Sequence, residues 1–212
     1  MADTSPTAPA PKLPTDSRDV AWVAIPALQP PAELAPHLRD VEVLLRVNPY
    51  YYFSAWRKIG PDAYHVELEN QSNQQKLALD LYVTPGPEQG LTISYRQGLK
   101  KRTYFTIEPL GTGSRLVITD DYEAVPESER EARMSEVDKS LKAWGEALRL
   151  YFLRLKRWSW VPGWRWYMRR VWVPMKPSAR RIVWLLFLIT VVEFLFFLFV
   201  LLIYVIEQGK EV

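Results

Sequence analysis

Residues Ala63–Val83 read AYHVELENQSNQQKLALDLYV. Apolar and polar side chains alternate through Ala63–Glu69 and again through Lys76–Val83. Alternation with a period of two is typical of a β-strand that buries one of its faces. The polar stretch Asn70–Gln75 between the two runs favours a turn. The sequence therefore predicts an antiparallel hairpin at this point.

More strand-like runs lie on both sides of this hairpin, separated by residues that favour turns. These runs are Val20–Ile25, Tyr50–Ile59, Leu91–Arg96, Lys101–Leu110 and Ser114–Glu123. The six runs from Tyr50 onward follow one another with short connections, so we expect them to form an antiparallel meander.

Two other stretches have the spacing of helices. Pro31–Val47 places Leu and Val residues three or four positions apart. The longer stretch, about Glu129–Trp158, carries one apolar stripe that includes Trp144 and Leu148. The predicted order is therefore strand, helix, six strands and a long helix.

This order resembles the helix-grip fold of the START/Bet v 1-like (SRPBCC) superfamily, which includes polyketide cyclases and lipid-transfer proteins. The resemblance covers about Val20–Arg157, and the segment GTGSRLVITDDYE, Gly111–Glu123, is similar to the last strand of many members. It implies an α+β domain over residues 20–157. In such a domain a curved antiparallel sheet of about seven strands wraps a long C-terminal helix and leaves a cavity for an apolar ligand.

Alternation also assigns a face to each strand residue. The apolar rows, together with side chains of the long helix, line either a solid core or a pocket, and the resemblance favours a pocket. The candidate cavity-lining residues are Tyr64, Val66, Leu79, Leu81, Ile93, Tyr95, Phe105, Ile118, Asp120, Trp144 and Leu148.

Motifs that carry chemistry are scarce. The chain has no Cys and two His, and it contains no Gly-rich phosphate loop, Ser/His/Asp set or metal-ligand spacing. His65 shares a strand face with Glu67 and Glu69, which indicates a solvated face. Asp120 alternates with Ile118, so its carboxyl either points inward as an acid or base, or ends the strand and pairs with a nearby cation. We predict no catalytic residue, metal site or cofactor.

The stretch Ile182–Ile206, IVWLLFLITVVEFLFFLFVLLIYVI, has 25 residues and one ionisable side chain. A helix needs about 20 apolar residues to cross a bilayer, so we predict a single transmembrane helix. The net charge of the chain is +3, but its positive charge is concentrated just before this stretch. Nine Lys and Arg residues and no acid lie between Arg154 and Arg181. By the positive-inside rule we expect the N-terminal domain on the cytoplasmic side, at the inner or plasma membrane if the source is bacterial.

Short segments complete the chain. Residues 1–19 are rich in Pro and Ala and have no apolar centre, so we expect a disordered arm and not a signal peptide. Residues 207–212 form a short tail after the predicted span. We therefore expect a single-pass, tail-anchored membrane protein.

The segment 158–181 interleaves Trp with Arg. Indole rings favour the lipid headgroup layer, and basic side chains are attracted to anionic lipid. Such a segment can also bind single-stranded nucleic acid by stacking, but the neighbouring span favours lipid. Pro162, Pro174 and Pro177 interrupt any long helix, so we expect short pieces at the membrane interface. The candidate interface residues are Trp158, Trp160, Trp164, Arg165, Trp166, Arg169, Arg170 and Trp172.

Glu193 lies one position from the centre of the predicted span, and Thr190 precedes it by three residues on the same helical face. An ionisable group at this depth costs on the order of 3 kcal/mol. Either the carboxyl contacts another membrane helix, or a lone protonated Glu is tolerated against lipid. We predict Thr190 and Glu193 as the site of an intramembrane contact.

These features favour a membrane-anchored protein that binds or transfers a hydrophobic ligand, such as a lipid, an acyl chain or an isoprenoid quinone. Its expected partners are membrane lipids and this small molecule, and not nucleic acid. The alternative is an accessory or structural subunit of a membrane complex, joined to an integral membrane partner through Glu193. A cyclase- or dehydratase-type enzyme that uses Asp120 or a cavity Tyr is a third, less favoured hypothesis.

Overall fold

The computed structural model describes residues 20–71, 75–97, 100–122 and 127–208, with the backbone alone for residues 75, 127–140 and 177. The predicted disordered arm, residues 1–19, and the last four residues of the predicted tail lie outside the described residues. The chain divides into two units, Met1–Pro174 and Met175–Val212.

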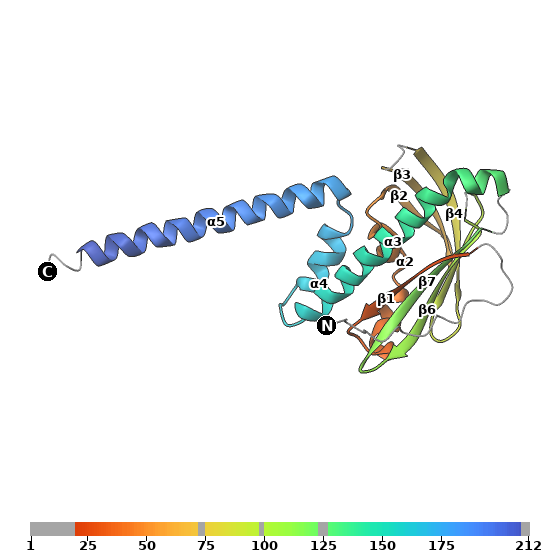
Figure 1. Ribbon diagram of the computed structural model, residues 1–212, viewed down its shortest axis with the longest axis horizontal. Coiled ribbons are helices and arrows are strands. Elements are labelled where there is room, and N and C mark those ends of the chain that lie inside the picture. The colour runs from red at the N-terminus through yellow and green to blue at the C-terminus, as the bar shows by residue number, and fades with distance from the viewer. Residues whose placement is uncertain (1–19, 72–74, 98–99, 123–126, 209–212) are drawn as a thin grey trace, which may run out of the picture. The chain divides into compact units, whose positions relative to one another are not determined.

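The first unit is built on a curved seven-stranded antiparallel sheet (Figure 1). The strands are β1 (Val20–Ala27), β2 (Tyr51–Gly60), β3 (Ala63–Asn70), β4 (Gln75–Pro85), β5 (Leu91–Tyr95), β6 (Arg102–Leu110) and β7 (Gly113–Asp121). Their order across the sheet is β1-β7-β6-β5-β4-β3-β2. The predicted meander is confirmed, and the first strand of the chain adds to its far end by pairing with the last.

The pairing register aligns the predicted apolar rows on one face, here called the inner face. Val66 of β3 lies opposite Leu79 of β4, and Leu81 of β4 lies opposite Tyr95 of β5. Farther along the sheet, Phe105 of β6 lies opposite Ile118 of β7. Side chains of directly opposed residues point to the same side of a sheet, so these rows form one continuous apolar surface.

The long helix α3 (Glu127–Arg157) runs across the inner face of the sheet (Figure 1). The ring of Trp144 meets that of Phe105 edge to face, with 5.6 Å between centroids. Leu148, one turn later, is fully buried. This contact forms the centre of the hydrophobic core. The apolar stripe of α3 and the apolar rows of the sheet bury each other there.

The predicted single helix over Pro31–Val47 is wrong in one respect. Two helices occupy this stretch, α1 (Pro31–Leu38) and α2 (Val41–Arg46). Asp40 between them has the non-helical angles φ −86° and ψ 73°. The physical reason lies in their packing: α1 contacts β6 and β7, whereas α2 contacts β2 at the opposite side of the sheet. One straight helix could not reach both places.

The segment 158–181, here called the Trp-rich segment, contains two short helical pieces, α4 (Trp164–Tyr167) and the π-helical turn η1 (Met168–Trp172). They lie between Pro162 and Pro174, as the proline positions predict. Both pieces belong to the same compact unit as the sheet.

The second unit is one helix, α5 (Pro177–Gln208), which contains the predicted span Ile182–Ile206. By length and composition α5 is able to cross a membrane. Its apolar side chains are exposed over most of its length among the residues that the structure describes.

Candidate functional site

The predicted cavity-lining residues all lie on the inner face or on α3, but their burial divides them. Eight are almost completely buried in the core: Val66, Leu81, Ile93, Phe105, Ile118, Asp120, Trp144 and Leu148. The other three, Tyr64, Leu79 and Tyr95, are only partly buried and pack against that core from one side. The inner face is therefore filled under the middle of α3 and less completely covered over β2–β5.

The partly buried residues form a surface that we call the inner wall. Its members are Tyr51, Trp56, Tyr64, Leu77, Leu79, Val83 and Tyr95, from β2, β3, β4 and β5. Aromatic rings meet in sequence along its β2 side: Phe53 contacts Trp56, and Trp56 contacts Tyr64, each pair with 5.5 Å between ring centroids. The inner wall is a broad apolar surface with aromatic side chains.

A polar cluster lies beside the inner wall. Asp120 of β7 is 1 % exposed and accepts three hydrogen bonds. The hydroxyl of Thr103 donates to Oδ1 over 2.6 Å. The ammonium of Lys100 and the hydroxyl of Tyr122 donate to Oδ2 over 3.0 Å and 3.2 Å. Three donors thus satisfy a carboxylate that is otherwise out of contact with water.

The direction of each hydrogen bond follows from the number of protons available. The single proton of Thr103 goes to Asp120, so the hydroxyl of Tyr95, 3.1 Å from Thr103 Oγ1, must be the donor in that pair. The hydroxyl proton of Tyr122 is likewise used on Asp120. Among the described residues, the two remaining protons of the Lys100 ammonium are the donors that this cluster can still offer.

Lys100 extends from the loop after β5 into this site, with 17 % of its side chain exposed. Its Nζ lies 5.1 Å from the ring centroid of Trp144 and 5.9 Å from that of Tyr95. Burial lowers the pKa of Lys100, but the Asp120 carboxylate and the neighbouring Tyr95 raise it more, so the pKa ends well above its ordinary value. The side chain is therefore a permanent cation at neutral pH and not an amine nucleophile.

The two phenols stay protonated as well. Burial raises the pKa of Tyr95 to about 12 despite the opposing effect of Lys100. Burial and the charge of Asp120 also raise the pKa of Tyr122. With its donors arranged around a satisfied carboxylate, the cluster is suited to hold a polar group in place, and it lacks a free base at neutral pH.

Sequence reasoning missed the contacts that Lys100, Thr103 and Tyr122 make with Asp120. Lys100 belongs to the run Lys100-Lys101-Arg102, which has the composition of an exposed turn. The one available signal was the inward alternation of Asp120, because a buried carboxylate requires a nearby cation or several donors.

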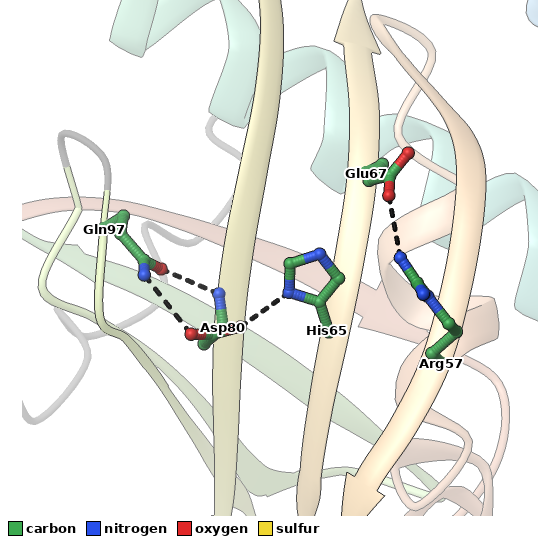
Figure 2. Close-up of polar contacts among 5 residues, drawn as sticks. All are labelled: Arg57, His65, Glu67, Asp80 and Gln97. Atoms are coloured by element: carbon green, nitrogen blue, oxygen red, sulfur yellow. Dashed lines mark hydrogen bonds and ion pairs between the residues drawn. The ribbon is translucent and has the colours of Figure 1, made fainter.

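The outer face of the sheet carries a second polar group, shown in Figure 2. Nδ1 of His65 lies 2.7 Å from Oδ1 of Asp80, and the amide of Gln97 donates to Oδ2 of the same carboxylate over 3.3 Å. The hydrogen bonds from His65 and Gln97 lower the pKa of Asp80. These contacts join β3, β4 and the loop after β5 on the side facing away from α3, and an ion pair between Arg57 and Glu67 lies beside them.

The candidate membrane-interface residues fall into two groups. Trp164 and Trp172 pack against the core cluster of the first unit, whereas Trp158, Trp160 and Trp166 are exposed. The three candidate arginines, Arg165, Arg169 and Arg170, are also exposed.

Thr190 and Glu193 lie on α5, in the second unit. The hydroxyl of Thr190 donates to the carbonyl of Leu186 over 3.0 Å, inside the same helix. Within the residues that the structure describes, no group of three or more His, Asp or Glu side chains could hold a metal ion.

No family model and no curated protein matches this sequence. Solved structures do match the first unit. The Zhui aromatase/cyclase from Streptomyces sp. R1128 is similar with a TM-score of 0.52 and 12 % identity, over 66 % of this chain and 97 % of that one. A START superfamily protein from Mycobacterium smegmatis is similar with a TM-score of 0.51 and 18 % identity, over 64 % and 98 %. The domain has the helix-grip fold.

A third helix-grip structure, the di-domain aromatase/cyclase StfQ from the steffimycin biosynthetic pathway, matches with a TM-score of 0.51 and 7 % identity. It covers 65 % of this chain and 51 % of the StfQ chain. At identities this low the similarity establishes the fold alone. The expected likeness to START and cyclase proteins is therefore confirmed for the architecture of the helix-grip domain.

Proposed function

We propose that the helix-grip domain binds a hydrophobic small molecule against the inner wall and that α5 holds the domain at a membrane. The observation that carries this proposal is the position of Lys100, an ammonium with two unused protons beside a partly exposed apolar surface. A ligand with a long apolar part and one polar end would use both features.

The partial exposure of the inner wall supports binding there. Ile93 and Phe105 show how completely apolar side chains of this sheet can be buried. Leu79 and Tyr64 point to the same side of the sheet but keep part of their surface in contact with water. Covering that surface with an apolar ligand is favourable by about 25 cal/mol for each Å² removed from water.

The charges of the polar cluster favour one kind of polar group at the end of the ligand. Lys100 and Asp120 together carry no net charge. A ligand carboxylate near Lys100 would also lie near the Asp120 carboxylate, and like charges in a partly desolvated site repel strongly. A carbonyl or hydroxyl oxygen can accept from the ammonium without that repulsion. We infer that the ligand ends in a neutral oxygen, as an isoprenoid quinone or an acyl ester does.

The fold neighbours support ligand binding in general terms, because they include a START superfamily protein and aromatase/cyclases. The contacts of Asp120 argue for binding over acid–base catalysis in this chain. Its two carboxylate oxygens already accept three hydrogen bonds, so a substrate proton would compete with protein donors for them.

The experiment uses the full chain in mild detergent. Native mass spectrometry should detect an apolar molecule that is released on unfolding. Titration with a short-chain isoprenoid quinone should quench part of the tryptophan emission, since Trp144 lies beside Lys100, and the quinone should bind several-fold more tightly than oleate. Equal binding of the two compounds would contradict the inference that the ligand ends in a neutral oxygen. Absence of binding by either, with no retained molecule, would refute the ligand-binding proposal.

The anchoring part of the proposal needs a separate test. The full chain should stay with membranes through a carbonate wash, because α5 is long and apolar enough to span. Deletion of 182–212 should release most of it, since α5 belongs to a separate unit from the helix-grip domain. Protease on the cytoplasmic side should digest the helix-grip domain, and protection of the domain there would reverse the proposed orientation.

A second candidate function, an accessory subunit of a membrane complex, rests on α5. Glu193 and Tyr204 are separated by three helical turns, so they lie within about 20° of each other around the helix. Thr190 lies about 60° away, which places the three polar side chains of the span on one face. Thr190 already bonds Leu186 inside the helix, so Glu193 is the group that would bind a neighbouring helix. Loss of a co-purifying membrane protein in Glu193→Leu, but not in Leu195→Ala, would favour this function.

A further inference from the structure

The Trp-rich segment is attached to the helix-grip domain at several points. Met168 of η1 and Val173, just after η1, are each 2 % exposed, and Trp164 and Tyr167 of α4 pack against the core while only partly buried. Nε1 of Trp164 donates to the carbonyl of Arg154 in α3 over 3.2 Å. Nε of Arg169 lies 2.9 Å from Oδ2 of Asp40, just before α2. These contacts fix which side chains of the segment face outward.

The outward side is aromatic and basic. Trp160 is 75 % exposed and Trp166 is 65 % exposed. The rings of Trp158 and Trp160 stack with 6.3 Å between centroids, which holds both indoles at the surface. Arg157, which precedes Trp158 in the chain, and Arg170 are exposed, and within the described part of the chain no carboxylate pairs with either.

Two other exposed apolar tips lie at the same end of the domain. The amide of Gln29, just after β1, donates to the carbonyl of Phe152 in α3 over 2.9 Å. The hydroxyl of Ser114, at the start of β7, donates to the carbonyl of Gln29 over 2.6 Å. These bonds bring the β6–β7 turn and the end of β1 to the C-terminal end of α3, as Figure 1 shows. Leu28 and Leu110 protrude there, 62 % and 45 % exposed.

We propose that Leu28, Leu110 and the indoles of Trp158, Trp160 and Trp166 form one surface that inserts into the headgroup layer of an anionic membrane. Isolated apolar tips from three loops, with basic side chains among them, suit a soft layer of headgroups and acyl chains. They do not form the continuous apolar patch that a protein interface buries at its centre. Charge also favours anionic lipid, because Glu33 and Asp40 at this end are each already paired with a basic residue.

This inference extends the proposed membrane location, on which it rests, by adding two loops of the helix-grip domain to the contact. The short connection between the Trp-rich segment and α5 supports this inference, since α5 begins five residues after Trp172. The domain would then lie against the bilayer on this end instead of moving freely about its anchor.

The absence of Cys from the chain allows a direct test. Single Cys replacements Leu28→Cys, Leu110→Cys and Trp166→Cys are made in the full chain and labelled with a polarity-sensitive dye. Lys76→Cys is the matched control, because Lys76 is exposed beside the β3–β4 turn, at the other end of the strands from the β6–β7 turn. Each labelled chain is incorporated into nanodiscs of phosphatidylcholine with or without phosphatidylglycerol.

In anionic discs we expect dyes at residues 28, 110 and 166 to shift to the blue and to lose several-fold of their quenching by aqueous iodide. The dye at residue 76 should not change, and neutral discs or high salt should weaken the effect. Water-exposed dyes at residues 28 and 110 in discs that hold the chain would overturn this inference and leave the anchor intact. A chain that does not enter discs would overturn the membrane location itself. Displacement of the effect by single-stranded DNA would assign the surface to nucleic acid and also overturn the inference.

Discussion

The indole Nε1 of Trp144 donates a hydrogen bond to the carbonyl oxygen of Leu44 over 2.8 Å. Leu44 lies in the last turn of α2, where carbonyl groups have no partner within the helix. The bond therefore closes the end of α2 and at the same time attaches α2 to α3, which are far apart in the sequence. Both residues are almost completely buried.

Replacement of Trp144 by Phe should show what this bond contributes. Phe keeps the aromatic contact with Phe105 in part but leaves a buried carbonyl without a donor, which costs roughly 1–3 kcal/mol. We expect the free energy of unfolding, measured in urea, to fall by that amount. Trp160→Phe, at an exposed position, should leave it unchanged. An equal effect of the two changes would show that the hydrogen bond is not the cause.

Lys100→Met should destabilise the domain, because it leaves the buried Asp120 carboxylate without its cation. Removal of one partner of a buried pair typically costs about 3–5 kcal/mol, and the partial exposure of Lys100 places the expected loss at the lower end. The double variant Lys100→Met/Asp120→Asn should recover much of this loss in urea unfolding. Lys58→Met, at an exposed position of β2, is the control. No recovery in the double variant would contradict the pairing.

Gly145 is required where α3 crosses β1. A Cβ atom at this position would lie 3.0 Å and 3.1 Å from the two methyl groups of Val23, and 3.2 Å from a methyl of Ile25. Gly145→Leu should therefore overpack the contact and lower stability by about 1–3 kcal/mol in thermal or urea unfolding. Lys142→Leu, on the exposed side of the same helix, should have little effect. A fully stable Gly145→Leu would mean that α3 does not approach β1 so closely.

Leu79→Trp and Ile93→Trp should separate a ligand surface from a filled core. Ile93 is fully buried, so the larger ring should overpack the core and cost about 1–3 kcal/mol. Leu79 is only partly buried, so its replacement should leave the melting temperature nearly unchanged and reduce quinone binding. A large loss of stability in both variants would assign the inner wall to the core and favour the accessory-subunit function.

Stability should also fall in mild acid because of His37. Burial and the nearby Arg165 lower the pKa of His37, against the smaller opposing effects of Asp40 and Glu33. The folded state therefore binds a proton less readily than the unfolded chain, whose His has a pKa of about 6.5. The contribution of neutral His37 to the free energy of unfolding is complete above that pH. It is lost as the pH falls from about 6.5 through the pKa of His37 in the folded state. In unfolding measured from pH 7.5 to 5, His37→Gln should flatten this dependence, and an unchanged slope would refute it.

The strands were predictable because their signal is local. Strand-like composition and alternation predicted all seven strands to within about two residues at each end, and the turn residues predicted the meander of the six strands from β2 onward. The break at Asp40 was not predictable, because it depends on which strands α1 and α2 reach after the sheet has formed. The same holds for Lys100: three basic residues in a row look alike in sequence, and only the position of Asp120 across the sheet decides which one turns inward.

The place of β1 in the sheet has a consequence for the order of folding. Val20 at the start of β1 pairs with Asp121 at the end of β7, so the first strand to be synthesised has no partner until the last has left the ribosome. The hairpins of the meander can form earlier from local contacts, whereas pairing across so long a loop is slow. We expect the docking of β1 onto β7, and of α3 onto both, to be the closing step. Until then the free edge of β7 is where a second nascent chain could pair wrongly.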